Sequence, residues 1–397
     1  MQPAAPPAAP PKTASSPDVR TLQLGMGWFP EQPGNGADRV YHALIQHLPD
    51  AGVGVRGLVV GSKDIATATG GRVRAFAASR QSLPARLWQV RRALRRKSGL
   101  LAESDLVAAH FALYAWPALD RLGERPFVMH FHGPWAGESR AEGEAAWKVR
   151  LKKHVEHRVY RRADRFIVLS DAFRDVLTQD YDISPERVRV VPGGVNVERF
   201  DTGCSRREAR ERLGWPTDRP LALSVRRLVR RVGLEPLVTA MKTVRRRVPE
   251  ALLLIAGKGP LAGALRDQIA AAGLEEHVRL LGFVPDADLP LAYRAADVSV
   301  VPTVALEGFG LIAAESLAAG TPPLVTPVGG LPEVVHDLSD GLVLPEATPG
   351  ALADALAGAL AGERPLPSAE ACQAYARDRF AWPRVARQVR DVYDEVL

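Results

Sequence analysis

Short apolar segments alternate with segments of helical periodicity along almost the whole chain. Each apolar segment ends near glycine, proline or aspartate, and apolar positions then recur at the three- and four-residue spacing of an amphipathic helix. Repeated alternation of this kind predicts parallel, doubly wound sheets with helices on both faces. The predicted strands are residues 21–25, 55–60, 106–109, 127–132, 165–169, 188–191, 221–225, 251–256, 278–281, 298–301 and 321–326.

A polar and charged stretch, residues 200–219, interrupts this alternation near the middle of the chain. The chain has 397 residues, which exceeds the usual size of one domain. We therefore predict two Rossmann-like α/β domains, over residues 19–198 and 199–379, that face each other across a central cleft. Ligands bind outside the carboxyl ends of the strands in such sheets, so two facing sheets can hold one ligand from both sides.

The two ends of the chain differ from this pattern. Residues 1–18 are rich in proline and alanine and are predicted to be a disordered tail. They lack the positively charged start and the long apolar core of a secretory signal. Residues 380–397 carry apolar side chains at helical spacing, including Trp382, Val385 and Val389, and are predicted to pack back on the first domain.

Composition says little about the fold but limits the kinds of partner that the protein can bind. Hydrophobic residues make up 46% and charged residues 24% of the chain, as in soluble globular proteins. The formal net charge of +7 favours anionic partners such as phosphates, nucleic acid or an acidic membrane surface. The two cysteines, Cys204 and Cys372, have no metal-ligand spacing and form no disulfide framework, so we expect a cytoplasmic protein.

The most informative segment is a glycine loop in the second half. A predicted strand leads into Gly308, Phe309 and Gly310, and a helix is predicted to begin at Leu311. The backbone N–H groups at such a helix start, together with the helix dipole, favour an anion. Glycine also lets the backbone approach a diphosphate without a Cβ in the way. We predict that Phe309, Gly310 and Leu311 bind the phosphates of a nucleotide.

Two carboxylates flank this glycine loop. Glu307 lies on the loop, where it can contact the hydroxyl groups of a sugar attached to the diphosphate. Glu315 lies about one turn into the helix and can accept hydrogen bonds from the ribose hydroxyl groups, as an acidic residue does in dinucleotide-binding folds. The alternative, that both are solvated surface charges, is the weaker hypothesis because of the glycines between them.

Four arginines follow the first predicted strand of the second half. The apolar segment 221–225 leads directly into Arg226, Arg227, Arg230 and Arg231. Guanidinium groups donate paired hydrogen bonds to phosphate oxygens, and each charge-assisted bond contributes roughly 1.5–3 kcal/mol. Because these arginines stand at the carboxyl end of a strand, we favour a phosphate site over a solvated basic turn.

The first half holds a histidine pair at the end of a predicted strand. His130 and His132 share one face of the segment 127–132, because side chains alternate along a strand. His132 stands at the carboxyl tip, where ligands lie, whereas His130 is predicted to belong to the core. No carboxylate or third ligand has suitable spacing near them, so no metal site is predicted.

The chain resembles the family 4 glycosyltransferases, which are retaining enzymes of the GT-B fold. The most specific match is the pair Glu307 and Glu315, which are separated by seven residues that include a Gly-Phe-Gly loop, and the resemblance covers nearly everything after the tail. Supporting segments are residues 191–196, 255–260, 281–285, 296–302 and 327–333. The resemblance implies that His132 contacts the transferred sugar, that Gly36 lies on a loop near the donor phosphates, and that Arg227 binds the diphosphate.

One position departs from the family pattern. Where the family has a lysine, this chain has Val232, whose side chain cannot bind phosphate. Arg231, one residue earlier, is predicted to take the place of that lysine. Its role depends on where the tertiary structure puts the guanidinium group.

These residues predict a glycosyltransferase that moves a sugar from a nucleoside-diphosphate sugar, UDP- or GDP-linked, to an acceptor hydroxyl. The predicted catalytic residues are His132, Arg227 and Glu307. Arg227 and the loop N–H groups stabilise the departing diphosphate, so neither a metal ion nor another cofactor is expected. By resemblance the anomeric configuration is retained, and we favour front-face displacement because no carboxylate stands out as a covalent nucleophile.

The acceptor and the rival functions stay open. A lipid-linked envelope glycan and a small natural product are both compatible acceptors. A sugar-nucleotide epimerase of the same fold is one alternative function. A non-catalytic protein that binds a nucleotide sugar or nucleic acid is another, although we find no nucleic-acid-binding motif of interleaved aromatic and basic residues, so no nucleic-acid partner is expected.

Two basic segments in the first half, residues 86–97 and 147–162, suggest a further partner. Leu83, Leu87 and Val90 add an apolar stripe at helical spacing beside the first of them. A basic amphipathic helix can lie on an anionic membrane, while a solvated surface helix is the alternative. We expect a cytoplasmic protein that can lie peripherally on the inner membrane surface.

Overall fold

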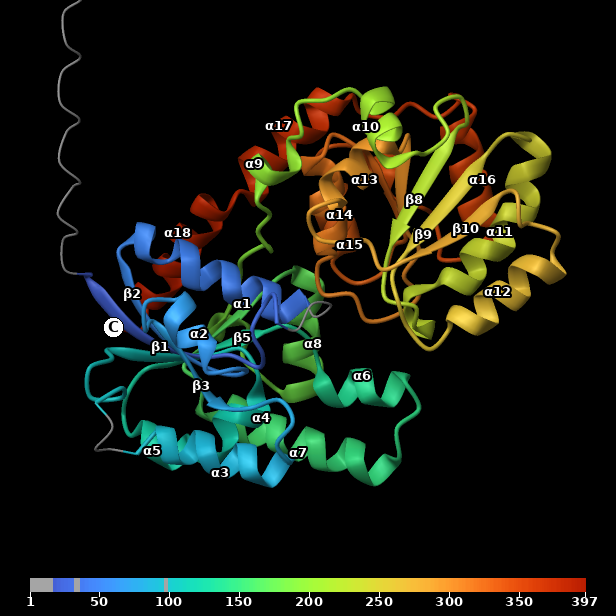
Figure 1. Ribbon diagram of the computed structural model, residues 1–397. Coiled ribbons are helices and arrows are strands. Elements are labelled where there is room, and N and C mark those ends of the chain that lie inside the picture. Colours follow the sequence, from blue (N-terminus) through green and yellow to red (C-terminus); the bar gives the residue numbers. More distant parts are fainter. Residues whose placement is uncertain (1–16, 32–35, 96–98) are drawn as a thin grey trace, which may run out of the picture.

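Two α/β domains make up the computed structural model, which describes residues 17–31, 36–95 and 99–397 (Figure 1). One domain is built on a seven-stranded sheet and the other on a five-stranded sheet, and the paired strands of both sheets are parallel. The predicted fold class is therefore confirmed. Of the predicted tail, residues 1–16 lie outside the described residues.

The first sheet has the strand order β3-β2-β1-β4-β5-β6-β7. Its central strands β4 and β5 are buried along their whole length, because helices cover both faces of a parallel sheet. β3 is missing from the strands that the apolar pattern predicts, since Arg74 breaks its short apolar run. The strands are β1 (Val19–Leu24), β2 (Val53–Val60), β3 (Val73–Ala77), β4 (Leu106–Ala109), β5 (Phe127–Phe131), β6 (Arg165–Val168) and β7 (Val188–Val190).

The helices of the first domain bury their apolar faces against this sheet. α8 is an example: the Ser170 side chain accepts a hydrogen bond from the N–H of Phe173 and so caps the helix, and Phe173, Leu177 and Tyr181 face the core. The helices are α1 (Gly36–His47), α2 (Asp64–Ala68), α3 (Leu83–Ala93), α4 (Ala112–Ala115), α5 (Leu119–Leu122), α6 (Trp135–Ala141), α7 (Ala146–Arg162) and α8 (Asp171–Tyr181), with 3₁₀ turns η1 (Pro49–Ala51), η2 (Trp116–Ala118) and η3 (Pro185–Arg187).

The second sheet has the strand order β10-β9-β8-β11-β12. Its strands are β8 (Leu221–Val225), β9 (Leu252–Ala256), β10 (Val278–Gly282), β11 (Val298–Val301) and β12 (Pro323–Val325). The helices are α9 (Val197–Phe200), α10 (Arg206–Leu213), α11 (Leu234–Arg247), α12 (Ala262–Ala271), α13 (Leu289–Ala295), α14 (Leu311–Ala318), α15 (Leu331–Val335) and α16 (Pro349–Leu360), with η4 (Arg230–Val232) and η5 (Asp340–Leu342). Within the described ranges, no helix is both long and apolar enough to cross a bilayer.

The strand order reverses once in each sheet, between β1 and β4 and between β8 and β11. Chain connections leave such a point in opposite directions, so a crevice opens there outside the carboxyl ends of the strands. Gly25 and His110 follow β1 and β4, and Arg226 and Pro302 follow β8 and β11. The topology alone therefore marks these two loop pairs as the places where a ligand would bind.

The chain crosses between the domains twice, along two neighbouring segments. The N–H of Val195 donates to the carbonyl oxygen of Phe380 at 2.7 Å, and Val195 forms a parallel bridge with Ala381. Gly194 is needed at this crossing, because a Cβ there would lie 2.5 Å from the Trp382 ring. The sheets end at Val190 and begin again at Leu221, while the domain limits at residues 198 and 379 remain predictions.

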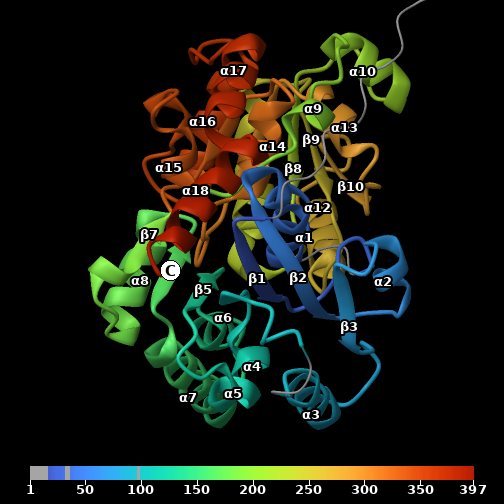
Figure 2. The same ribbon diagram turned by 90° about the vertical axis from the view of Figure 1, so that its left-hand side faces the viewer.

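The last two helices belong to different domains. α17 (Ala369–Phe380) packs on α14 of the second domain, whereas α18 (Trp382–Asp394) packs on α1, η1 and β6 of the first (Figure 2). Trp382, Val385 and Val389 are buried in the apolar cluster of the first domain. The C-terminal helix thus packs back on the first domain as its apolar spacing predicts.

A buried hydroxyl group ties α18 to the first sheet. The Tyr393 hydroxyl lies 2.8 Å from Nε2 of His130 and accepts a hydrogen bond from Nε2 of Gln23 at 3.1 Å. Tyr393→Phe leaves Nε2 of His130 buried and unpaired and removes one of the two hydrogen bonds of Gln23 Nε2, so we expect the free energy of unfolding to fall by about 1–3 kcal/mol in urea titrations. Tyr375→Phe is the matched control, because the buried Tyr375 hydroxyl has no partner among the described residues. Equal effects of the two substitutions would contradict this account of the docking.

Candidate active site between the domains

The arginine turn after β8 is held by an ion pair with the glycine loop. Nη2 of Arg226 lies 2.8 Å from Oε2 of Glu307 and donates to Oγ1 of Thr303 at 2.9 Å. Both charged side chains are largely buried, with 8% and 16% of their surfaces exposed. A charge pair this desolvated is stable only when its geometry and hydrogen bonds are good, as they are here. The pair brings the two predicted phosphate-binding loops side by side.

Arg227, the next residue, is exposed and lies near enough to Arg231 and to Glu138 of the first domain for their charges to act on it. Its guanidinium group makes no hydrogen bond or ion pair with the residues that the structure describes. Partial desolvation is the main reason that the pKa of Arg227 is lowered, and the neighbouring positive charge of Arg231 lowers it further. A cation without an internal partner, beside other cations, is the arrangement expected of an anion-binding group.

Arg231 is anchored on the loop that precedes Glu307. Its Nη1 donates to the carbonyl oxygen of Leu306 at 2.8 Å, and its own carbonyl accepts from the N–H of Val304 at 3.0 Å. Leu306 has a left-handed backbone with φ of 53°, so this contact holds a conformation that leucine rarely adopts. Val232, at the family's lysine position, is buried in the apolar core of the second domain.

The other side of the Arg231 guanidinium group faces the first domain. Glu138 of α6 lies 3.8 Å from Nη2, and Glu142 just beyond that helix lies 3.9 Å from Nε. Burial raises the pKa of Glu138, while the nearby Arg231 and Arg227 lower it. These contacts place α6 of the first domain directly opposite the arginine turn of the second.

The glycine loop presents its backbone, and not its aromatic ring, to the cleft. Phe309 is buried with its ring edge-on to Phe380, so only its main chain can contact a ligand. Gly310 has φ of 88° and precedes the first turn of α14. The N–H groups of Gly310 and Leu311 donate to no acceptor within the described ranges. They are free to bind an anion at the helix start.

Two glycines of the first domain lie against this loop. A Cβ on Gly36, the first residue of α1, would lie 3.6 Å from Cδ1 of Leu311. A Cβ on Gly193 would lie 2.8 Å from the side chains of Leu311 and Phe309. Gly36 is thus close to the loop that is predicted to bind the phosphates, while residues 32–35 before it lie outside the described residues.

Glu315 has a defined partner on α13. The Tyr293 hydroxyl donates to Oε2 of Glu315 at 3.2 Å. Burial raises the pKa of Glu315, and the positive charge of Arg39 from the first domain opposes this shift. The carboxylate keeps acceptor capacity for further hydrogen bonds, which is what contact with a ribose requires.

His132 stands at the end of a chain of buried polar groups in the first domain. Its Nε2 lies 3.0 Å from Nδ1 of His110, and Nε2 of His110 lies 3.1 Å from Oε1 of Gln23. The Gln23 amide group donates to Thr21 and Tyr393, so Oε1 is an acceptor and His110 must carry its proton on Nε2. Nδ1 of His110 then accepts from the Nε2–H of His132, which leaves Nδ1 of His132 without a proton.

The same burial keeps these imidazoles neutral. Desolvation lowers the pKa of His132 to about 4. It also lowers the pKa of His110, on which the neighbouring His130 acts in the same direction. A neutral His132 in a fixed tautomer can orient a hydroxyl group but carries no charge near neutral pH.

Several residues of this site are not predicted from the sequence patterns. His110 follows β4 as His132 follows β5, so the carboxyl-edge rule could have identified it. Glu138 gives no such signal, because only the tertiary fold brings α6 to the arginines. Trp135 at the start of α6 stacks edge-on against Phe111, and Nζ of Lys152 lies 4.9 Å from its ring centre.

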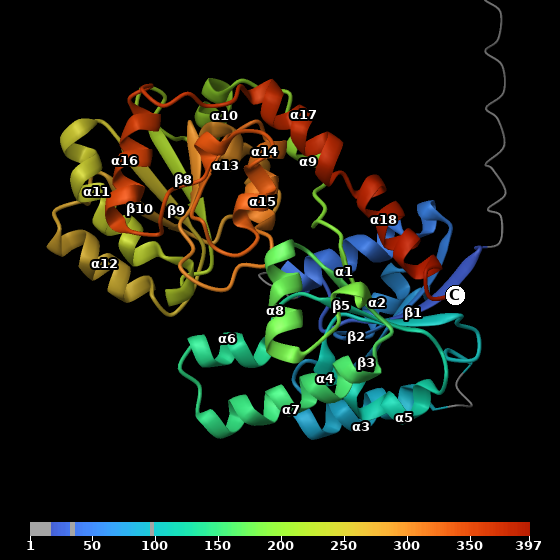
Figure 3. The same cartoon turned by 180° about the vertical axis from the view of Figure 1, so that it is seen from behind.

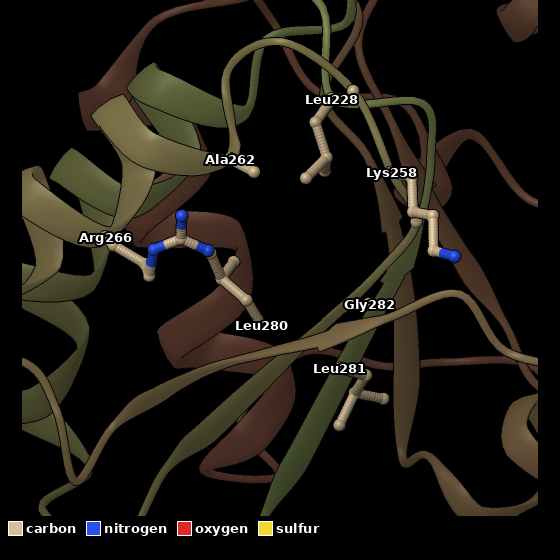
Figure 4. Close-up of a pocket in the computed structure, with 9 residues that line it drawn as sticks. Leu228, Lys258, Ala262, Arg266, Leu280, Leu281 and Gly282 are labelled. Atoms are coloured by element: carbon tan, nitrogen blue, oxygen red, sulfur yellow. The ribbon is translucent and has the colours of Figure 1, made fainter.

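A pocket of about 370 Å³ opens at the same edge of the second sheet (Figure 4). Its lining comes from the loops that follow β8 and β9, from the end of β10 and from α12, and includes Leu228, Lys258, Arg266 and Leu281. The Lys258 and Arg266 side chains lie on opposite sides of the hollow. The pocket adjoins the arginine turn, since Leu228 follows Arg227 directly.

The described residues hold no group of three or more histidine, cysteine or acidic side chains arranged for a metal ion. The expectation that transfer needs no metal or other cofactor stays a prediction. Cys204 and Cys372 are both buried as free thiols.

Two family models match the chain one after the other. The model described as Glycosyltransferase Family 4 matches residues 34–199, and the model described as Glycosyl transferases group 1 matches residues 205–379. The first match covers most of the seven-stranded domain and the second covers the five-stranded domain. The arginine turn and the glycine loop both lie in the second match.

Curated relatives are similar over most of the chain. The D-inositol 3-phosphate glycosyltransferase of Saccharomonospora viridis is 34% identical over 309 residues, which is 74% of this chain and 70% of that protein. The enzyme of the same name from Corynebacterium jeikeium is 32% identical over 307 residues, 74% of this chain and 72% of that protein. Other relatives are aligned over as little as 56% of their length.

Solved structures share the fold at lower sequence identity. Sucrose-phosphate synthase from Thermosynechococcus elongatus has a TM-score of 0.74 at 23% identity, over 95% of this chain and 98% of that chain. Anabaena HepE, solved in complex with UDP and glucose, has a TM-score of 0.74 at 20% identity, over 95% of this chain and all of that chain. These likenesses confirm the two-domain fold.

The depressed pKa of His132 predicts a pH dependence of stability. Between pH 6.5 and about 4 the unfolded chain binds a proton on His132 that the folded chain does not, so stability falls as the pH falls. His132→Gln should reduce this slope by up to about 1.4 kcal/mol per pH unit, measured by denaturant titration between pH 7 and 5. An unaltered slope in His132→Gln would contradict the neutral state of the imidazole.

Proposed function

Since the chain belongs to the family 4 glycosyltransferases, we propose that it moves a sugar from a nucleoside-diphosphate sugar to an acceptor hydroxyl with retention of anomeric configuration. The observation that carries this proposal is the ion pair between Arg226 and Glu307. It holds an unpaired guanidinium group, Arg227, beside a helix start with free N–H groups. A diphosphate is the ligand whose charge and size suit both.

The leaving diphosphate binds Arg227 and the N–H groups of Gly310 and Leu311. Negative charge grows on this group as the bond to the sugar breaks, and donors that are already in place stabilise it without reorganisation. We propose that Arg231 adds positive charge in place of the lysine of the family, while its bond to Leu306 positions the loop. No metal ion or other cofactor takes part in this proposal.

The nucleoside and the sugar extend from the diphosphate in opposite directions. Glu315, held by Tyr293, accepts hydrogen bonds from the ribose hydroxyl groups. Glu307 uses Oε2 for Arg226 and Thr303, and its Oε1 contacts hydroxyl groups of the donor sugar. We propose a UDP- or GDP-linked donor.

Transfer proceeds at the front face of the sugar. The bond between the anomeric carbon and the diphosphate oxygen breaks, the acceptor oxygen bonds to that carbon from the same side, and the acceptor proton passes to the leaving phosphate oxygen. Neutral His132 orients the sugar by accepting a hydrogen bond on Nδ1 and takes no proton. Positioning and electrostatic stabilisation together lower the barrier.

Contacts between the domains close the site and exclude water. Arg39 of α1 lies 2.7 Å from Asp286 of the second domain, which also pairs with Arg199 at 2.8 Å. The N–H groups of Asp171 and Ala172, at the start of α8, donate to the carboxylate of Glu333 at 2.7 and 3.0 Å. These contacts match a closed form in which the acceptor hydroxyl is aligned with the donor.

The acceptor side is set by α6, which places two carboxylates opposite Arg231. We propose a hydroxyl-bearing acceptor, either a lipid-linked envelope glycan or a small natural product. The action is proposed to take place in the cytoplasm, at or near the inner membrane surface.

A thermal-shift panel of UDP-, GDP-, ADP- and TDP-sugars tests the donor. A ligand that binds only the folded chain stabilises it by mass action, by about 2.7 kcal/mol at a concentration one hundred times its Kd. One nucleotide should raise the melting temperature well above the others. Incubation with that donor then separates the functions: released nucleoside diphosphate supports transfer, whereas an isomerised intact nucleotide sugar supports an epimerase. No shift with any nucleotide would refute the proposal.

Arg227→Ala should abolish most turnover and leave the fold intact. The side chain makes no hydrogen bond or ion pair with the described residues, whereas the loss of one charge-assisted contact to the leaving group costs about 2.7–4 kcal/mol, or a hundred- to a thousandfold in kcat. Donor hydrolysis and circular dichroism measure the two effects. Arg246→Ala, an exposed arginine of α11, is the control. Near-normal turnover in Arg227→Ala would remove this residue from the mechanism.

A further inference from the structure

The outer face of α7 combines exposed apolar side chains with unpaired cations. Trp147 and Leu151 are 64% and 57% exposed and lie on one face, because residues four apart are neighbours on a helix. His154 and Arg158 continue this face, while Val155 and Val159 point to the core. Such exposure of large apolar groups marks a surface that contacts something else.

α7 is also strongly basic. Its 17 residues include seven lysines and arginines, and its single acidic residue, Glu156, is buried. Arg150, Arg158 and Arg161 are exposed and form no ion pair within the described ranges. The positive charge of this face is therefore available to an external partner.

α3 and η2 repeat the same combination beside α7. Trp88 on α3 is 56% exposed and Trp116 on η2 is 39% exposed. The Arg92 guanidinium group lies 5.4 Å from the centre of the Trp88 ring. α3 contains three arginines and no acidic residue, and of these arginines Arg91 pairs with Asp120. Together α3, η2 and α7 define what we call the tryptophan face, carrying Leu83, Trp88, Trp116, Trp147 and Leu151.

These elements are neighbours on one edge of the first domain. Both α3 and α7 pack against η2, and Figures 1 and 3 place them along the edge away from the second domain. Figure 2 shows α3 and α7 at either end of this edge, with α4 and α5 between them. Of the eight large apolar side chains that are exposed in the described residues, five belong to the tryptophan face.

We propose that the tryptophan face docks the protein on an anionic lipid bilayer. Indole rings suit the boundary between headgroups and acyl chains, since they combine a large apolar surface with a polar N–H group. Each lysine or arginine close to the surface adds attraction to anionic headgroups. The opposite charges of the face and the lipid are the reason to choose a bilayer over a second copy of this chain, which would bring like charges together.

Docking would hold the acceptor side of the cleft close to the bilayer. α6 packs on α7 and at the same time presents Glu138 to Arg231 of the second domain. A single helix therefore separates the tryptophan face from the cleft. If the protein is the transferase that we propose, this geometry favours the lipid-linked acceptor over the soluble one.

The test is co-sedimentation of the full chain with vesicles, without nucleotide sugar. Vesicles of phosphatidylcholine with about one third phosphatidylglycerol should bind the protein, and vesicles of phosphatidylcholine alone should not. Binding should weaken as salt is raised from about 0.1 M, where the Debye length is about 10 Å, to 1 M, where it is about 3 Å.

Two double variants separate the apolar and the charged contributions. Trp147→Ala with Leu151→Ala should weaken partitioning roughly tenfold, and Arg150→Gln with Arg158→Gln roughly thirtyfold. Arg212→Gln with Arg246→Gln, on α10 and α11 of the second domain, is the matched control and should bind as the unaltered chain does. Circular dichroism checks that each variant is folded.

Four outcomes would overturn the proposal. They are absent vesicle binding, equal binding to neutral and anionic vesicles, an equal loss in the control variant, and salt-sensitive binding to duplex DNA in place of vesicles. A concentration-dependent dimer that Trp147→Ala with Leu151→Ala dissociates, without vesicle binding, would assign the face to a second copy. The nucleotide thermal shift distinguishes a failure of membrane docking from a failure of the proposed function, because it does not depend on the tryptophan face.

Discussion

The site depends on an excess of positive charge in the second domain, where the arginines after β8 outnumber the carboxylates that neutralise them. Arg226 and Arg227 directly follow β8, and Arg231 follows one turn later. Glu307 neutralises the first through a buried ion pair, while Arg231 faces its nearest carboxylates at distances too long for direct hydrogen bonds. Arg227 is left without a hydrogen bond or ion pair among the described residues, and the diphosphate that we propose as ligand would supply the missing negative charge.

The arginines can lie this close together because glycines let the neighbouring loops approach each other closely. Gly257 follows β9 at a point where a Cβ would collide with the carbonyl oxygen of Arg226, so the arginine turn can lie directly on the neighbouring loop. Gly193 has the same role at the crossing between the domains, where Phe309 and Leu311 occupy the space of its missing side chain. The glycine loop of the second domain and the crossing segment at Gly193 thus lie in direct contact.

Much of the fold and part of the site follow from local patterns. The alternation of apolar and helical segments predicts two parallel sheets, and the spacing around Gly308 and Gly310 predicts a loop that leads into a helix start. β3 escapes because Arg74 breaks its apolar run. The contacts between loops could not be predicted for another reason. Arg226 and Glu307, like His110 and His132, are far apart in the chain, and local periodicity does not indicate that they are in contact.

By itself the sequence determined the fold class, the glycine loop, the arginine turn and the histidine at the strand tip, because each depends on neighbouring residues and on periodicity. Only the tertiary structure decided which arginine is neutralised and which is free, since that depends on partners from other loops and from the other domain. It also decided that His132 is neutral, that Arg231 faces Glu138, and that three tryptophans share one outer edge. Burial and distance set these properties, and both arise only when the chain is packed.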